Sequence, residues 1–526
     1  MLPNLVLLLL VSISVEHAVG SSQTEVVLVD VALNEGALSG PLPSDFTSFS
    51  VEVHCAMVML MNETDNTPRP SYLNMMGFLR KASRGTRGPN LRVGGDSTDE
   101  SVFRWNESDP VPFPSTYRVT PRDVKAFGYV AGFNGTLKLG LNLGYDLPKE
   151  SVNYAAAVIE LLKPLPLLQA FEIGNEPDLY AKYGKRSSSY NYAAYQKDYE
   201  AWMAALKHGG HKTLPHLPII QGAVFCCVAF DAGLPGYIRT FVHDGELSSV
   251  SYHHYPLTAC HGHKVNIHEL VTAEAAESVD RLSSFASTAV AVGRPFYIGE
   301  GNSVACGGAY GVSDTFASTL WSIDTLFHAA KHNMTRWNFH GCPQGAYTPI
   351  ALEGKVSPVD QRYSVARPLY YGMWLVSDAI ARNAHVVPTH QSSPWDVNET
   401  IASFATHTEQ WLPEPGGPNC TSRSTIVVLN RQWRTHTKVR VKATVRGLSG
   451  SHLGTAYGRR LAPASHQLGA THGIYFAGLT FDNTTDGLPH GQYAPFSVSV
   501  SKEGALEFDL DSISIVTISL YDHCNH

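Results

Sequence analysis

Two stretches of the chain lead an apolar run directly into a glutamate. Phe171–Ile173 is followed by Asn175 and Glu176. Pro295–Ile298 is followed by Glu300. A strand buried in a parallel barrel is an unbroken apolar run, and the chemistry of such barrels lies where the strands end, so these two glutamates can face each other. A facing carboxylate pair can cleave a glycosidic bond, since one member protonates the leaving oxygen and the other attacks or stabilises the anomeric carbon.

The elements that must position this pair repeat along the chain. Strand-like apolar runs alternate with helical patterns, and this alternation predicts an α/β fold, a (β/α)₈ TIM barrel. An open doubly wound sheet is the alternative, but no Gly-rich phosphate loop follows the first strand. The predicted strands are Phe49–Val53, Leu91–Val93, Leu137–Leu141, Phe171–Ile173, Pro218–Ala223, Ser249–His253, Pro295–Ile298 and Arg336–Phe339. The predicted helices are Tyr72–Ala82, Pro121–Ala131, Val152–Leu162, Tyr190–Lys207, Tyr237–Val242, His268–Val290 and Ser313–Ala330.

The C-terminal part of the chain has a different pattern. Beyond about residue 384 the helical patterns give way to short alternating runs, which predict a C-terminal β-sandwich domain. These runs are Thr425–Leu429, Lys438–Ala443, Phe496–Val500 and Ile513–Leu520. Ahead of the barrel, a further strand over residues 24–33 has no barrel partner, so we expect it to join the sandwich. The predicted domains are a catalytic barrel over 45–384 and a β-sandwich over 385–526.

Composition and charge restrict the partners. The 526 residues suffice for two or three domains with sizeable cores, and the formal net charge is -7. Lysines and arginines are needed to hold nucleic acid or another polyanion along an extended groove. The chain has a negative net charge and no cluster of basic residues, so the sequence disfavours such a partner. A small terminal sugar is easier to accommodate. The oligomeric state is left open by these observations.

The N-terminal segment, the sequons and the cysteines indicate a secreted, extracellular protein. Residues 1–20 hold the apolar run Leu5–Val11 and the small residues Ala18–Gly20, typical of a cleaved signal peptide, although no basic residue precedes the run. That run is short for a bilayer span, so we expect no membrane partner. Glycosylation sequons begin at Asn62, Asn106, Asn134, Asn333, Asn398, Asn419 and Asn483. The 8 cysteines are compatible with a few disulfides, whose pairing the spacing does not specify.

Three other polar features have a simple interpretation. The segment Cys260–His263 resembles a metal-binding cluster, because it holds one cysteine and two histidines. No fourth ligand is evident at a usable spacing, so we expect a solvated loop with a disulfide cysteine. Adjacent cysteines seldom bond to each other, so at least one of Cys226 and Cys227 should pair elsewhere or be a buried thiol. Of His253 and His254, one is expected to be a hydrogen-bonded wall residue.

Four segments, taken together, carry a family resemblance. They are Leu91–Asp99, Asn175–Pro177, Tyr252–Tyr255 and Gly299–Asp314. They resemble glycoside hydrolase family 79, which contains heparanases and exo-acting β-glucuronidases, and Asn302–Gly308 is most similar to its microbial, particularly fungal, members. The resemblance covers most of the barrel and, more loosely, the sandwich. It implies a retaining mechanism that needs no cofactor and no metal.

The resemblance also implies roles for the residues around the two glutamates. Glu176 matches the general acid/base and Glu300 the nucleophile. Asn175 matches the residue that holds the hydroxyl next to the anomeric carbon. Tyr255 matches a tyrosine that hydrogen-bonds near the nucleophile, and Glu52 aligns with a glutamate that contacts sugar hydroxyls.

A glycine turn is the expected receptor for a substrate carboxylate. Gly307 and Gly308 match a turn whose backbone N–H groups receive a uronate, and Tyr347 matches a tyrosine hydroxyl that does the same. Backbone donors have a specific merit here, because they bind the anion without a full positive charge. A lysine in their place would stabilise the anion of Glu300 and weaken its attack.

Two departures separate the chain from heparanases. His54 stands where heparanases carry an aspartate after the first strand, and Asp96, a further expected substrate-site residue, replaces the threonine after their paired glycines. No long excisable basic linker lies between the second and third strands. The favoured function is therefore exo-hydrolysis of terminal β-linked glucuronate, or its 4-O-methyl ether, from a glycan. A heparanase-like endo-enzyme and an inactive glycan-binding relative are the alternatives.

Overall fold

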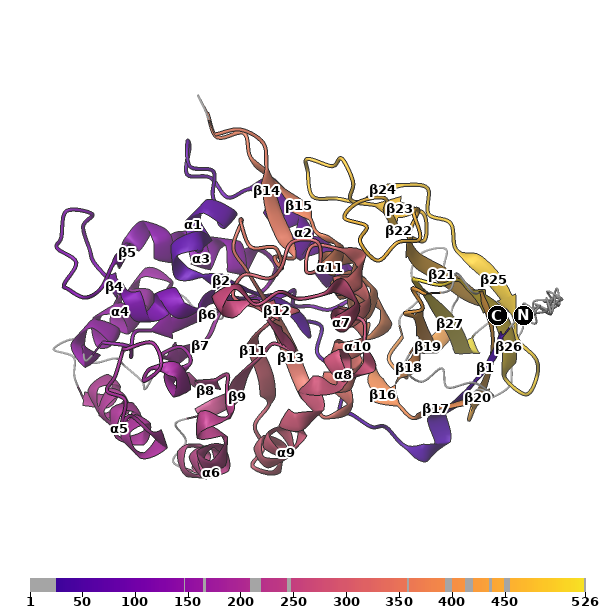
Figure 1. Cartoon of the computed structure of the whole chain (residues 1–526), viewed down its shortest axis with the longest axis horizontal. Helices are drawn as coiled ribbons and strands as arrows, with labels where there is room; N and C mark the ends of the chain where they lie inside the picture. Colours follow the sequence, from indigo (N-terminus) through magenta and orange to yellow (C-terminus); the bar gives the residue numbers. More distant parts are fainter. Residues whose placement is uncertain are drawn as a thin grey trace, which may run out of the picture.

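The computed structural model describes residues 25–145, 147–163, 167–208, 219–243, 247–356, 359–392, 400–411, 420–434, 438–448 and 455–524. The signal peptide expected over residues 1–20 lies outside these residues, as do the sequons at Asn398 and Asn419. Figure 1 shows two parts side by side, a barrel of strands surrounded by helices and a domain built almost entirely of strands.

The barrel follows the predicted alternation. Its parallel strands close in the order β11-β13-β2-β3-β6-β7-β8-β9. The predicted (β/α)₈ fold is therefore confirmed, and the open doubly wound sheet is excluded because both edges of the sheet are paired. The strands are β2 Thr47–Glu52, β3 Asn90–Gly94, β6 Thr136–Leu141, β7 Leu168–Ile173, β8 Ile220–Phe225, β9 Leu247–His254, β11 Phe296–Gly301 and β13 Met334–Gly341.

Proline and polar caps explain where many of the helices begin. Helices α2, α3, α4 and α11 each carry proline in the first turn, where its missing N–H costs no hydrogen bond. The prediction of a single helix over 268–290 was wrong, because Thr272 accepts a hydrogen bond from Ala275 N–H and starts a new helix there. The helices are α1 Val53–Leu60, α2 Pro70–Ala82, α3 Pro121–Asn134, α4 Pro148–Leu161, α5 Tyr192–His208, α6 Leu234–His243, α7 Ile267–Leu270, α8 Ala273–Glu277, α9 Ser283–Ala291, α10 Phe316–Lys331 and α11 Pro368–Ala379.

The second domain consists of two facing sheets. One has the order β17-β1-β20-β26, and the other is nine-stranded and contains β19, β27 and β21 at its centre. The N-terminal strand β1 pairs with β17 antiparallel and with β20 parallel, and in Figure 1 its indigo ribbon lies among the yellow strands. The strands are β1 Glu25–Ala32, β16 His385–Val387, β17 Thr389–Ser392, β18 Ile401–Thr408, β19 Cys420–Asn430, β20 Val439–Arg446, β21 Thr455–Pro463, β22 Ile474–Phe476, β23 Leu479–Thr480, β24 His490–Gly491, β25 Phe496–Ser499, β26 Ala505–Leu510 and β27 Ser514–Cys524.

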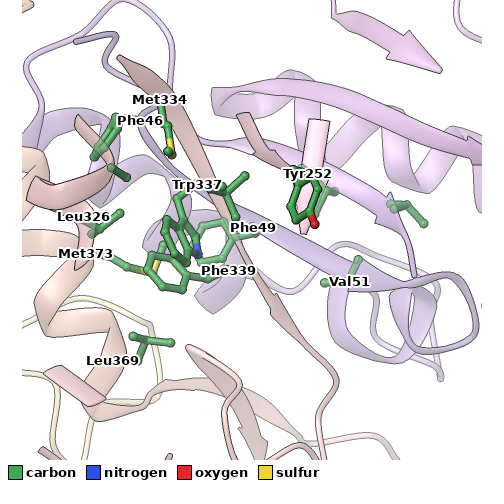
Figure 2. Packing of buried hydrophobic residues seen from close by; sticks show 14 of the residues in the cluster. Phe46, Phe49, Val51, Tyr252, Leu326, Met334, Trp337, Phe339, Leu369 and Met373 are labelled. Atoms are coloured by element: carbon green, nitrogen blue, oxygen red, sulfur yellow. The ribbon is translucent and has the colours of Figure 1, made fainter. Parts of the chain in front are cut away.

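The structure has two apolar cores, one between the two facing sheets and a larger one that extends from the barrel to residues of the second domain such as Leu429 and Leu461. In β1 the alternate residues Val27, Val29 and Val31 are buried against the facing sheet, as period-2 strands require. In the barrel wall, Trp337 of β13 packs among Phe49 and Phe339 (Figure 2). Within the described residues no helix combines the length and the apolar character needed to cross a membrane.

Short strands lie in the loops that follow the barrel elements and form separate two-stranded sheets. They are β4 Ser101–Phe103, β5 Tyr117–Val119, β10 Leu257–Thr258, β12 Val304–Ala305, β14 Ile350–Glu353 and β15 Tyr363–Ala366. Strand β10, after β9, pairs in parallel with β12, after β11. This pairing ties together the two loops that follow neighbouring barrel strands.

Candidate active site

A cavity of about 740 Å³ lies where the barrel strands end. Seven of the nine residues predicted for the site line it, and they lie at or after the ends of six different barrel strands. They are Glu52, Asp96, Glu176, Tyr255, Glu300, Gly307 and Tyr347. The other two lie beside it: Asn175 is buried and donates a hydrogen bond to Asp96, and Gly308 lies against Tyr347.

The two predicted catalytic glutamates meet in this cavity. One carboxylate oxygen of Glu176 and one of Glu300 lie within 4.8 Å of each other, and both lie within 4.8 Å of a ring nitrogen of His253. Retaining glycosidases hold their carboxyl groups about 5 to 5.5 Å apart, whereas inverting enzymes leave about 6.5 to 9.5 Å for a water. The observed separation therefore has the size that direct attack by one carboxylate requires.

The position of Glu176 depends on an unusual backbone. Its φ of 49° and ψ of 54° lie in the left-handed region, and its N–H donates to the Val224 carbonyl of β8 at 3.0 Å. Pro177 then starts a short 3-10 helix, η3 Pro177–Leu179. A left-handed conformation at a residue other than glycine carries strain, and such strain is concentrated at functional positions.

Arg92 holds Glu300 in place from inside the barrel. Its guanidinium, on β3 and fully buried, donates to Glu300 at 2.7 Å, to Glu172 at 2.5 Å and to Asn175 at 3.0 Å. The Tyr255 hydroxyl donates to the other oxygen of Glu300 at 2.8 Å. Glu300 is therefore fixed on both oxygens, by a cation and by a phenol.

Arg92 lies in the segment Leu91–Asp99 that carries the family resemblance, but no role was predicted for it. An arginine between Leu91 and Val93, in a run predicted to be a buried strand, was the signal that could have found it. A buried guanidinium requires acceptors on several sides, and a barrel interior offers them only where carboxylates converge.

His253 links the two glutamates. Its Nδ1 lies 2.8 Å from Glu176, and its Nε2 lies 3.4 Å from an N–H group of Arg92. Because Arg92 can only donate, Nε2 is the acceptor, and the proton of the neutral ring then sits on Nδ1, where it is donated to Glu176. His254 is the predicted wall residue, since it is buried and bonds to Ser278 at 2.9 Å.

The environment shifts the pKa values of the two glutamates in opposite directions. Burial, followed by the charges of Glu300 and Asp96, raises the pKa of Glu176 well above its usual range. Burial would also raise the pKa of Glu300, but His340, Arg92 and the hydrogen bond from Tyr255 outweigh it and lower that pKa. His340 can act in this way because neighbouring carboxylates raise its own pKa. One glutamate is thereby kept protonated and the other ionised.

His253 also lowers the pKa of Glu300, through the positive charge that its ring carries at low pH. Burial lowers the pKa of its imidazole to about 4, so the ring is neutral at pH 7 and cannot add a charge next to Glu300. At neutral pH the positive charges beside Glu300 are therefore those of Arg92 and His340. The neutral ring still positions Glu176 through its hydrogen bond.

A buried aspartate aligns Asn175 with the pair. Asp99 accepts hydrogen bonds from Asn175 N–H at 3.2 Å and from the Tyr180 hydroxyl at 2.6 Å. The side chain of Asn175 is held separately, since its oxygen accepts from Arg92 and its nitrogen donates to Asp96 at 3.0 Å. Both ends of this amide are thus oriented at the cavity wall.

Glu52 and Asp96 also line the cavity. Glu52 accepts hydrogen bonds from the backbone N–H groups of Asp96 and Ser97, at 3.2 and 3.0 Å, and lies 3.2 Å from His340. Gly95 makes this approach possible, because its φ is +78° and a Cβ there would lie 2.3 Å from the Glu52 carboxyl. Burial and the charge of Glu52 raise the pKa of Asp96 to about 6.

The glycine turn contributes to the cavity lining. Gly307 has a φ of +87° and lines the cavity, and a Cβ on it would meet no atom within 4 Å. Gly308, with a φ of +83°, lies so close to Tyr347 that a Cβ would come within 2.7 Å of its backbone nitrogen. A disulfide between Cys260 and Cys306 anchors the turn, as expected for a disulfide cysteine in the 260–263 loop.

In several groups of side chains the possible ligand atoms lie close enough together to hold a metal ion. Glu176, His253 and Glu300 are one such group, but Arg92 places a permanent cation beside it, which disfavours a second positive charge. Cys55 is bonded to Cys342 and offers no thiolate. The adjacent Cys226 and Cys227 are both free and half-buried, so neither pairs elsewhere.

Comparisons with known proteins agree with this geometry. No family model matches the chain. A β-glucuronidase of Aspergillus niger is 23% identical over 335 residues, which cover 57% of this chain and 59% of that protein. A β-glucuronidase of Neurospora crassa is 23% identical over 433 residues, which cover 74% of this chain and 72% of that protein. The chain is similar to fungal β-glucuronidases.

Solved structures share the whole fold. A 4-O-α-L-rhamnosyl-β-D-glucuronidase from Fusarium oxysporum, solved as a Rha-GlcA complex, has a TM-score of 0.73 at 21% identity and covers 94% of this chain and 100% of that one. A GH51 arabinofuranosidase from Xanthomonas axonopodis pv. citri has a TM-score of 0.63 at 14% identity, covering 95% and 100%. The comparisons support the resemblance to glycoside hydrolase family 79 and the assignment of the chain to the glycosidases. The chain matches less than two thirds of the length of the Aspergillus protein.

Proposed function

We propose that the protein is a retaining exo-β-glucuronidase that removes terminal β-linked glucuronate from glycans. The observation that carries this proposal is the pair of Glu176 and Glu300, whose carboxylate oxygens lie within 4.8 Å and whose pKa values move apart. Two carboxyl groups with separated pKa values are suited to different roles, one as acid and one as nucleophile.

In the first step, Glu300 attacks the anomeric carbon while the bond to the leaving oxygen breaks. Glu176 gives its proton to that oxygen, and a glycosyl ester forms on Glu300. Esterification removes the negative charge of Glu300, so the pKa of Glu176 falls. Glu176 can then accept a proton from the water that attacks the ester, and Glu300 leaves as a carboxylate.

The proposed sugar orientation places the uronate at the glycine turn. The turn at Gly307 and Gly308, together with Tyr347, offers donors that carry no charge of their own. Asn175, Glu52 and Asp96 offer polar groups to the ring hydroxyls. A neutral glucoside lacks the carboxylate that the turn is proposed to bind, so it should be a poor substrate.

Two observations support exo-action on a glucuronide. The cavity of about 740 Å³ falls within the roughly 300 to 1,000 Å³ of pockets that enclose small ligands. The Aspergillus, Neurospora and Fusarium proteins compared above are β-glucuronidases by name. A heparanase-like endo-enzyme would need a groove open at both ends and cations along it.

We also propose that the protein is secreted. Two disulfides, Cys55–Cys342 and Cys260–Cys306, support this location, because disulfides persist in oxidising compartments. The sequons at Asn106 and Asn483 are exposed, as acceptor asparagines must be.

The proposed activity is tested with nitrophenyl β-glucuronide. We expect the purified chain to release nitrophenol, to yield a product of retained anomeric configuration, and to lose the reaction in Glu300→Gln. Nitrophenyl β-glucoside serves as the matched neutral control, and comparable rates on both sugars would remove the proposed role of the glycine turn. Cleavage restricted to the interior of long heparan chains would favour the endo-enzyme, and no activity on any uronide would favour a glycan-binding protein.

A further inference from the structure

Two adjacent thiols line the active-site cavity, and the proposed hydrolysis uses neither. Cys226 and Cys227 follow β8 directly, and both are free and half-buried. Asp178 of η3, which follows the neighbouring strand β7, lies beside them. One carboxylate oxygen of Asp178 and the two sulfurs all lie within 4.8 Å of one another.

The backbone holds these three ligand groups in a defined arrangement. One oxygen of Asp178 accepts a hydrogen bond from the N–H of Cys227 at 2.7 Å. The N–H of Cys226 lies 3.3 Å from each of the two oxygens and donates to both. Asp178 is 7% exposed, so its carboxylate has little freedom to turn away. A carboxylate has about four lone-pair positions, and these bonds leave positions free for a further partner.

We propose that Cys226, Cys227 and Asp178 form a binding site for a soft divalent cation of the Zn²⁺ and Cd²⁺ class. Two thiolates with one carboxylate are a ligand set that such ions prefer, whereas Mg²⁺ and Ca²⁺ prefer oxygen ligands only. The ion would displace one proton from each thiol to solvent. The cavity would supply the fourth ligand as water, because both cysteines face it.

An ion at this site would reach the catalytic acid. Glu176 lies two positions before Asp178, and its carboxyl is hydrogen-bonded by the Cys226 thiol. Conversion of that thiol to a metal-bound thiolate removes this donor, and the ion with its water would occupy the part of the cavity beside Glu176. Occupation should therefore inhibit hydrolysis, so that the site links catalysis to the supply of soft metal ions.

Direct binding is measured by titrating the full chain with Cd²⁺ and following the ultraviolet charge-transfer band of Cd²⁺-bound thiolate. We expect a band that saturates at one ion per chain. Removal of groups that only orient metal ligands already costs about 10- to 100-fold in affinity, so Cys227→Ser, which removes a ligand, should weaken binding by at least about 100-fold. Asp178→Asn should weaken it by at least about tenfold.

Controls separate this site from the catalytic glutamates. Glu300→Gln disrupts the alternative group of Glu176, His253 and Glu300 and should leave the thiolate band unchanged. If the proposed hydrolase activity is present, Cd²⁺ should inhibit the native chain, EDTA should reverse the inhibition, and Cys227→Ala should resist it. The binding readout stands whether or not a substrate is found.

The proposal is overturned if no thiolate band forms, if the band survives in both Cys227→Ser and Cys227→Ala, or if the two thiols prove not to be free in the folded chain. Circular dichroism and the thermal unfolding midpoint of each variant show whether a lost band reflects misfolding. If both Cys227 variants misfold, Asp178→Asn decides alone, since the native affinity in that variant would overturn the proposal.

Discussion

The charge of Glu300 should be the largest removable cause of the raised pKa of Glu176. Two unit charges 4.8 Å apart repel by about 3.5 kcal/mol at an effective dielectric constant of about 20. Glu300→Gln keeps the shape of the side chain and removes this repulsion. The ionised form of Glu176 then becomes more favourable, so its pKa should fall. The charge of Arg92, no longer balanced by Glu300, would act in the same direction.

The measurement is a carbon-13 NMR titration of the glutamate side-chain carboxyl groups. The signal of Glu176 is assigned from its absence in Glu176→Gln, and its titration is compared between the native chain and Glu300→Gln. Asp96→Asn is the graded control, since it also removes a nearby negative charge. Asp96 keeps more contact with water than Glu300, so screening should make its effect smaller.

An unchanged pKa of Glu176 in Glu300→Gln would refute the reasoning. It would mean that the two carboxyl groups do not interact at the separation described here, and they could not then act on one sugar. An equal fall in Asp96→Asn and Glu300→Gln would show instead that the general acidity of the cavity, rather than one partner, controls the pKa of Glu176.

Three further outcomes are expected. The kcat/KM for nitrophenyl β-glucuronide should rise with pH as Glu300 ionises, because the pKa of Glu300 is lowered. At higher pH it should fall as Glu176, whose pKa is raised, loses its proton. In Glu176→Gln this fall at alkaline pH should disappear. Tyr347→Phe removes a hydrogen bond to a charged group, worth about 1.5 to 3 kcal/mol, so kcat/KM for the glucuronide should drop roughly 10- to 100-fold while that for the glucoside stays the same. Serine at both Cys260 and Cys306 opens a bridge that spans 46 residues and should lower the free energy of unfolding by about 2 to 5 kcal/mol in urea denaturation. Unfolding at the native urea concentration would show that the bridge adds no stability.

Much of the fold could be predicted from local patterns. All eight barrel strands were found as apolar runs, because burial on both faces leaves little room for polar residues. The helices were less regular than predicted. Over 268–290 the helical periodicity continues through Thr272, but a side-chain cap there competes with the helix and divides it. Helix α1, only eight residues long, was too short to give a clear period.

The candidate site was predictable in part. Glu176 and Glu300 follow strands, and strand ends in a parallel barrel converge whatever the intervening sequence. The partners that set their chemistry were harder to find. Arg92 is recorded in the sequence only as a charge within an apolar run, and the contact between His253 and Glu176 joins residues from two different strands.

The chain's local patterns thus determined which strands form and which carboxylates stand at their ends, since period and propensity act over a few residues. Only the closed barrel decided that carboxylate oxygens of Glu176 and Glu300 lie within 4.8 Å of each other. It also decided that Arg92 donates a hydrogen bond to Glu300. The pKa values follow from these separations and from burial. Coulomb energies depend on distance in space, and residues far apart in the chain acquire that distance only when the strands between them pair.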